Sequence, residues 1–322
     1  MLIAPTEKQN DLLDAIQELQ SLEVTSLEQA KELFTQKSIV LKDADEQEVN
    51  TLQQQFEGIN AAIAFVEKNQ KQPSMIQKLK IAKEQFTLSE LQEEVSKWNT
   101  DELVQHVENI RSSLRKKEDE LKELREKETL LRKWSVLDFY PKDIFKHPYT
   151  KTKMGVIPQA VDNAYLEILK NSDLISVHEV YHTREEIGLL VTYPRKAQLE
   201  AKTELAEAHF SIVWYAFEEA PSIELKKNLE TQKAVVEAKK KVLDDLQEEK
   251  DLLRKLQLSA EVTYNELQKE QAKNELVNGQ HVFVLQGWLT TKAVDDVEVQ
   301  LKEKLGEGEY VFLPLEIAEE EY

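Results

Sequence analysis

Apolar residues recur at helical spacing over two long parts of the chain. In the first part they fall at alternating intervals of three and four residues in 49–66 and at heptad positions in 103–131; in the second they mark a seam over 225–267. Neither Gly nor Pro occurs between Pro221 and Gly279. Because a repeat of about 3.5 residues keeps one side of a helix facing a partner, the pattern predicts long helices that pair along two apolar seams, as in a coiled coil.

Each seam is defined by its apolar positions. Those of the first are Leu103, Val107, Ile110, Leu114, Leu121, Leu124 and Leu131, with Lys117 and Glu128 as charged exceptions; those of the second are Leu225, Leu229, Val236, Leu243, Leu246, Leu253, Ala260 and Leu267. Antiparallel pairing of the seams is expected to bring Leu103 alongside Leu267. Upstream, Pro73 breaks the helical pattern, and Thr87 with Glu90 forms a capping box that begins another helix.

The residues between the two helical tracts alternate between strand and helix patterns. Strands are predicted at residues 154–157, 174–181, 187–193 and 210–217, and helices at 160–169 and 195–209. The resulting order of strand, helix, strand, strand, helix, strand is that of a ferredoxin-like fold.

Both ends of the chain carry a shorter pattern of strand, helix and strand. At the start, strands around residues 2–4 and 22–27 flank a helix, and at the end, strands at 282–285 and 310–313 flank a helix at 291–304. A small sheet with one helix buries too little surface to be stable alone. We therefore expect the two halves to join into a second lobe of the same kind. We also expect a few native residues to precede the first strand.

Together these patterns predict an α+β fold with two ferredoxin-like α/β lobes joined by a long antiparallel coiled-coil rod. The proximal lobe is expected to combine residues 1–45 and 279–322, the rod residues 46–139 and 221–278, and the distal lobe residues 140–220. A helix of about fifty residues would give a rod of roughly 75 Å.

Composition narrows the functional classes. The formal net charge of −19 disfavours a general nucleic-acid binder, and the absence of Cys excludes disulfides and thiolate chemistry. With only 7 Gly in 322 residues, neither the Rossmann nor the P-loop phosphate-binding motif occurs. No apolar run suggests a membrane span or a signal peptide, so we expect a soluble chain in the cytoplasm.

One motif matches the signature of a metal site. Residues 178–182, HEVYH, match the HExxH signature of zinc peptidases, which requires a helix. The alternating, β-branched context favours a strand, on which His178 and His182 would lie about 13 Å apart. We therefore expect surface histidines here. The other histidines are not spaced like the members of a Ser/His/Asp site or like metal ligands. The sequence therefore predicts no catalytic, cofactor-binding or metal-binding residue.

Two further residue groups are assigned structural roles. The four tryptophans, Trp98, Trp134, Trp214 and Trp288, are expected to be packing anchors, with Trp214 in the core and Trp134 at the junction of the first helical tract with the distal lobe. The three lysines at 239–241 fit the solvated face of a coiled coil; an acidic helix or anionic lipid is the alternative partner for them.

Four segments, in the same order along the chain, carry a family resemblance. They are LIAPTEKQNDLLDAIQELQSLEVTSL at the start, WSVLDFYP at 134–141 with MGVIP at 154–158, FEEAPSI at 217–223 and FVLQGWL at 283–289. This set resembles the N-terminal cytoplasmic domain of subunit I of V-type ATPases (ATP synthases), the prokaryotic relative of eukaryotic subunit a. The family signature ends in GW-[VL]-P; Gly287 and Trp288 match it, and Thr290 replaces the Pro.

The resemblance implies a non-catalytic stator role in a rotary, ion-translocating ATPase. Family members link the membrane sector to heterodimeric peripheral stalks, which dock on both lobes, and thereby resist rotor torque. They continue into a membrane half with ion half-channels, which we expect to be missing after residue 322, leaving a soluble domain at the cytoplasmic face of the membrane. The resemblance implies no cofactor, small-molecule ligand or nucleic acid.

Two other classes of function remain as alternatives. A coiled-coil tether or scaffold unrelated to the rotary ATPase would explain the helices, although SMC-like proteins also need the phosphate loop that is lacking here. A metallopeptidase acting through HEVYH would require zinc binding.

Overall fold

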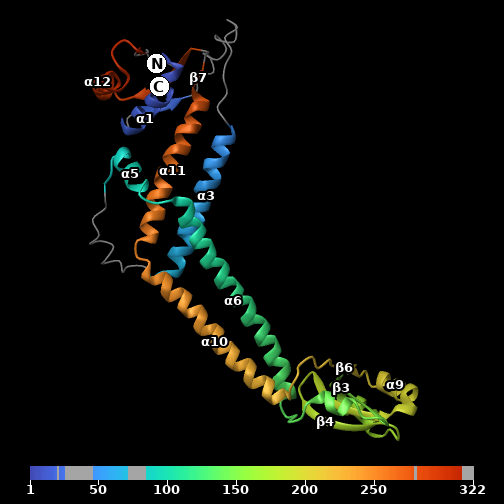
Figure 1. Ribbon diagram of the computed structural model, residues 1–322. Helices are drawn as coiled ribbons and strands as arrows, with labels where there is room; N and C mark the ends of the chain where they lie inside the picture. Colours follow the sequence, from blue (N-terminus) through green and yellow to red (C-terminus); the bar gives the residue numbers. More distant parts are fainter. Residues whose placement is uncertain (20–21, 26–45, 72–84, 279–280, 314–322) are drawn as a thin grey trace, which may run out of the picture. The chain divides into compact units, whose positions relative to one another are not determined.

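The computed structural model describes residues 1–19, 22–25, 46–71, 85–278 and 281–313 (Figure 1). Pro73 and the end of the helical pattern at Gly279 lie outside these residues. The chain divides into two compact units: unit 1 is Met1–Arg111 with Leu243–Tyr322, and unit 2 is Ser112–Val242. Each unit combines helices with one small antiparallel sheet, so the predicted α+β class is confirmed.

The two ends of the chain share the sheet of unit 1. Its strand order is β2-β8-β1-β9, and β7 pairs with β8. β1 lies antiparallel to β8, with Leu2 opposite Leu285. The strands are β1 (Leu2–Pro5), β2 (Leu22–Thr25), β7 (Val277–Asn278), β8 (Val282–Leu289) and β9 (Val311–Phe312).

Helices α1 (Gln9–Leu19) and α12 (Val294–Leu305) pack on one face of this sheet. Each strand puts alternate residues on that face, as a pleated sheet requires. Leu2 and Phe283 therefore join Leu12 and Leu301 in one buried cluster. Short 3-10 turns, η1 (Thr6–Lys8) and η4 (Thr291–Ala293), precede the two helices.

Also in unit 1, α3 (Glu46–Asn69) and α11 (Leu252–Glu275) lie side by side (Figure 1). They run antiparallel: the rings of Phe56 and Tyr264 are 5.5 Å apart, and Gln70, just after α3, contacts the residues just before α11. Between the helices, Ile59, Val66 and Leu256 are almost fully buried. Burial of this apolar face stabilises both helices more than their intrinsic propensity does.

The expected uninterrupted helix after Pro221 is wrong. It is divided into α10 (Pro221–Glu248) and α11 by a turn at residues 249–251. Side chains and backbone at the end of α3 bind this turn: Gln70 Nε2 donates to Leu246 O at 2.7 Å and to Glu249 O at 3.1 Å, and Lys71 N donates to Gln247 Oε1 at 2.8 Å. These bonds satisfy carbonyls that a helix end leaves free, which stabilises the break.

The expected register of the second tract against the first is also wrong. Helix α6 (Thr100–Trp134) begins beside Ser259, whose Oγ bonds Thr100 Oγ1 at 2.9 Å. Leu103 accordingly packs against the cluster that contains Leu256. The stretch of α11 around Tyr264 has α3 as its neighbour instead, because the chain provides two successive partner helices where the pattern suggested one.

A short helix, α5 (Leu88–Val95), precedes α6 and confirms the predicted capping box. Thr87 accepts a hydrogen bond from the backbone of Glu90, and the Glu90 carboxylate accepts one from the backbone of Thr87. These paired bonds satisfy two amides at the start of the helix and fix its first residue.

In unit 2, α6 and α10 run antiparallel. Lys239 Nζ contacts Glu118 Oε1 at 2.5 Å, and Gln232 Nε2 donates to Glu128 Oε2 at 2.7 Å. The predicted α6 seam positions are its buried or half-buried ones. On α10, however, the choice of Val236 is wrong: it is 49% exposed, whereas Val235 is buried.

In the sheet of unit 2, the strands lie side by side in the order β4-β5-β3-β6. Numbered along the chain within this sheet, they are its second, third, first and fourth strands, and this is called the strand ranking. The four strands of unit 1 that form the path β2-β8-β1-β9 follow the same ranking. The elements are β3 (Thr150–Pro158), α8 (Ala164–Lys170), β4 (Ser176–His182), β5 (Glu186–Pro194), α9 (Gln198–Glu207) and β6 (Ser211–Ile212), with α7 (Pro141–Phe145) before β3 and 3-10 turns η2 (Val161–Asn163) and η3 (Arg195–Ala197).

The predicted last strand at 210–217 is too long, because only Ser211–Ile212 forms β6. After one more backbone bond, from Val213 N to Met154 O at 2.9 Å, the chain turns away. The Tyr215 hydroxyl donates to Glu219 O at 2.5 Å and its ring is buried, which fixes this departure.

The sheet of unit 2 is covered on both faces. Helices α8 and α9 cover one face, where Ile157, Leu189 and Val191 are buried. The end of α6 covers the other with Trp134, which is 1% exposed and meets the Tyr181 ring edge-on at 5.0 Å. The expected burial of Trp214 is wrong: at the sheet edge, this side chain is 83% exposed.

The contact of α6 with this sheet includes an ionic network. Its contribution to the stability of unit 2 is expected to depend on pH. Glu186 Oε1 accepts hydrogen bonds from Lys133 Nζ at 2.7 Å and Tyr181 OH at 2.8 Å. The bond from Lys133, followed by that from Tyr181, holds the pKa of Glu186 below its ordinary value. A carboxylate with a depressed pKa stabilises the fold above its unfolded pKa of about 4.3 and loses that contribution as the pH falls through the lower folded value.

We expect Glu186→Gln to lower the free energy of unfolding of unit 2 by about 1 kcal/mol at pH 7, and by less at pH 3. Urea unfolding at the two pH values measures this difference. Glu185→Gln, at an exposed neighbouring position, is the control and is expected to have no effect at either pH. An equal loss at pH 3 and pH 7 for Glu186→Gln would contradict the ionic explanation.

Candidate functional site

The HEVYH segment lies on strand β4, as its alternating pattern predicts. Both His178 and His182 are exposed. Four residues of strand separate them by roughly 13 Å, whereas a zinc site needs both imidazoles on one metal ion. The strand therefore does not bring them together as ligands of one ion.

Glu179, the acidic residue of this segment, is part of a surface ion network. Its carboxylate contacts Lys170 Nζ at 2.7 Å and His182 Nε2 at 2.5 Å. These two hydrogen bonds, that of Lys170 first, lower the pKa of Glu179. A general base that works near neutral pH needs the opposite shift. The environment of Glu179 is thus that of a structural ion pair.

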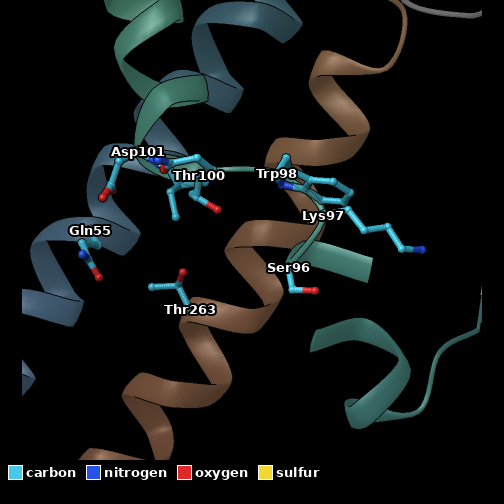
Figure 2. Close-up of a pocket in the computed structure, with 9 residues that line it drawn as sticks. Gln55, Ser96, Lys97, Trp98, Thr100, Asp101 and Thr263 are labelled. Atoms are coloured by element: carbon cyan, nitrogen blue, oxygen red, sulfur yellow. The ribbon is translucent and has the colours of Figure 1, made fainter. Parts of the chain in front are cut away.

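Unit 1 contains an open pocket of about 610 Å³ at the start of α6 (Figure 2). Its lining consists mainly of polar side chains: Gln55, Ile59, Ser96, Lys97, Trp98, Asn99, Thr100, Asp101 and Thr263. Figure 2 shows that these come from three separate stretches of the chain.

Two polar groups of this pocket hold helices together. The Trp98 indole and the Thr100 hydroxyl both bond the buried Ser259 Oγ, at 3.1 and 2.9 Å. Asn99 Oδ1 accepts the backbone N–H of Asp101 at 3.0 Å, which caps α6. No His lines the pocket, and two of its hydroxyls are engaged structurally: Thr100 Oγ1 bonds Ser259 Oγ and Ser96 Oγ donates to Glu93 O.

The described residues lack two further features. No group of three His, Cys, Asp or Glu side chains there is placed to hold a metal ion. None of the described helices has the length and apolar character needed to cross a bilayer.

Exposed apolar side chains mark the sheet of unit 1 on the face opposite α1 and α12. Because Phe283 and Leu285 face the helices, Val282 and Trp288 on the same strand point the other way. Val282 is 40% exposed and Trp288 43%. More than half of Trp288 is therefore covered, so its expected packing role holds in part, and Val284 on the same face is 3% exposed. The exposed parts of Val282 and Trp288 are a candidate contact surface.

Among known proteins, the chain shows similarity to solved structures. No protein-family model matches the chain, and no curated protein matches it. The chain is similar to a crystal structure of the cytoplasmic N-terminal domain of subunit I, homolog of subunit a, of V-ATPase, with 13% sequence identity and a TM-score of 0.44. The alignment covers 96% of this chain and 97% of that chain. An identity and a TM-score this low do not assign the chain to that family.

Proposed function

We propose that this chain is a non-catalytic stator domain of a rotary V-type ion-translocating ATPase. In this proposal, residues 1–45 with 279–322 and residues 140–220 form two ferredoxin-like lobes. Residues 46–139 and 221–278 form the coiled-coil rod between them. The domain works at the cytoplasmic face of the membrane, where it links the membrane sector, through a following C-terminal half, to peripheral stalk heterodimers and resists rotor torque.

The pairing of β1 with β8 carries the proposal. Leu2 lies opposite Leu285, so strands from both chain ends complete one sheet. A second sheet with the same ranking of strands is formed wholly within residues 150–212. Such a chain path suits a spacer, since the inserted lobe can be reached only through an outgoing and a returning helical tract.

The helices support a mechanical role. The antiparallel contact of α6 with α10 includes the Glu118–Lys239 and Glu128–Gln232 pairs. None of the 7 Gly of the chain lies in either helix, so neither contains the flexible residue that most weakens a helix interior. Two lobes that each contact a stalk would raise the effective concentration of the second contact once the first has formed.

Binding of a stalk tests the proposal. The purified chain is mixed with the peripheral stalk heterodimer of the V-type ATPase from the same organism, and complex formation is measured by size exclusion and calorimetry. We expect a stable complex, with no ATP hydrolysis by the chain itself. Two folded partners that fail to associate would favour the alternative of an unrelated coiled-coil tether.

A further inference from the structure

A group of cations and exposed aromatic rings lies around the start of β3 in unit 2, between Trp214 after β6 and Arg195 after β5. It is called the basic strip here and consists of Tyr149, Lys151, Lys153, Arg195, Gln198 and Trp214. We propose that the basic strip is a docking site for an acidic segment of another protein. This inference goes beyond the proposed function, and it does not require that the chain be part of a rotary ATPase.

Described contacts connect the residues of the strip in pairs. Lys153 Nζ lies 6.0 Å from the centre of the Trp214 ring, and Lys151 Nζ donates to Gln198 Oε1 at 2.8 Å. Arg195 N donates to Tyr149 O at 3.0 Å. Because Lys151 and Lys153 are two residues apart on β3, they point to the same face of the sheet.

The charges of the strip lack acidic partners. Within the described residues, Lys151, Lys153 and Arg195 form no salt bridge, and their contacts are to an amide, a ring and the carbonyl oxygen of His147. Some other cations of unit 2 do have acidic partners, as Lys133 has Glu186. In a chain with 61 acidic and 42 basic residues, these three cations form a local positive field.

The aromatic rings of the strip are exposed to an unusual degree. Trp214 is 83% exposed and Tyr149 79%. Large rings beside cations are the residues that most often dominate the energy of protein interfaces. An acidic segment with some apolar side chains would pair with the cations and cover both rings.

A slender protein segment fits this strip better than a membrane or a nucleic acid. With a net charge of −19, the chain repels extended anionic surfaces, while screening limits exposed charges to a range of about 8 Å at physiological salt. A segment lying across the start of β3 would meet the local positive field and little of the remaining acidic surface. A flat bilayer or a duplex would face both.

The test uses two fluorescein-labelled synthetic peptides of 16 residues, one alternating Glu with Ala and Leu, the other with Gln in place of Glu. Binding of each peptide to the full chain at physiological salt is measured by fluorescence anisotropy. We expect the Glu peptide to bind, and the Gln peptide to bind at least tenfold more weakly. The double variant Lys151→Glu with Lys153→Glu should raise the Kd for the Glu peptide at least tenfold. Trp214→Ala should raise it about threefold or more.

The matched control is Lys240→Glu with Lys241→Glu, which makes the same change in net charge at two exposed positions of α10. We expect it to change the Kd less than twofold. Equal losses in both double variants, or equal binding of both peptides, would overturn the proposal. Binding to vesicles with 30% phosphatidylserine that depends on Trp214, without peptide binding, would also overturn it. If circular dichroism shows that the Glu variants unfold, Gln replaces Glu at all four positions and the same criteria apply.

Discussion

Trp134→Ala is expected to destabilise unit 2 by about 3–5 kcal/mol. The side chain is 1% exposed and is the largest of the fully buried residues. It fills the space between the end of α6 and the sheet, where it packs with Leu131, Leu137, Met154, Leu190 and Tyr215. Since these neighbours belong to different elements, they cannot close the resulting cavity without moving the sheet.

Hydrogen exchange followed by mass spectrometry would measure this loss. Amides of β5 should exchange at least 100-fold faster in the variant, a factor that corresponds to about 2.8 kcal/mol. Trp214→Ala is the matched control, because the same residue type is removed from an exposed place; its effect should stay within about 0.5 kcal/mol. Similar protection in Trp134→Ala and in the unchanged chain would contradict the assignment of Trp134 as the centre of this core.

Gly155→Ala is the second substitution with a large expected effect. A Cβ at this position would overlap the Phe210 ring and the backbone oxygen of Ser211. The backbone oxygen cannot move away while β6 remains paired with β3, where Gly155 lies opposite Ile212. We expect a loss of about 2–3 kcal/mol and separation of β6 from the sheet.

Thermal unfolding and exchange of the β6 amides would measure the effect. Gly58→Ala, in the interior of α3, is the control, since no atom lies within 4 Å of the added Cβ. It should stabilise unit 1 by about 0.5–1 kcal/mol, because Ala is the better helix former. Unchanged stability in Gly155→Ala would mean that β6 is not held in the described register.

Local patterns were sufficient to predict most elements. The order of strands and helices between residues 150 and 212 follows from their alternation of apolar residues, and HEVYH lies on the strand that its β-branched neighbours indicated. The capping box at Thr87 was also predicted, since it depends on two residues only three positions apart. Such features are determined by neighbours in the sequence.

Features that depend on distant partners were not predictable. The break before α11 is stabilised by Gln70, 176 positions away from Leu246. Val235 rather than Val236 is buried on α10 because the polar residues Asn228 and Gln232 occupy its contact face. A pattern based on apolar residues alone assigns no role to these amides.

The basic strip was missed for a similar reason. Lys153 and Trp214 are 61 positions apart and meet only because β6 pairs with β3. The apolar context of Trp214 suggested burial, whereas its place just after the short edge strand β6 leaves it exposed. The alternation of Lys151 and Lys153 with Thr residues was the one local sign of a basic strand face.

Attachment of a stalk at two separate lobes is the central claim, and removal of one lobe tests it most directly. In the variant, residues 140–220 are replaced by a short Gly-Ser linker, and circular dichroism with exchange at β1 and β8 verifies that unit 1 is folded. In a pull-down with the stalk heterodimer, we expect one contact to be lost and the other kept, with affinity for an assembly that engages both lobes reduced about 100-fold. Unchanged binding of the stalk by the variant would contradict the claim.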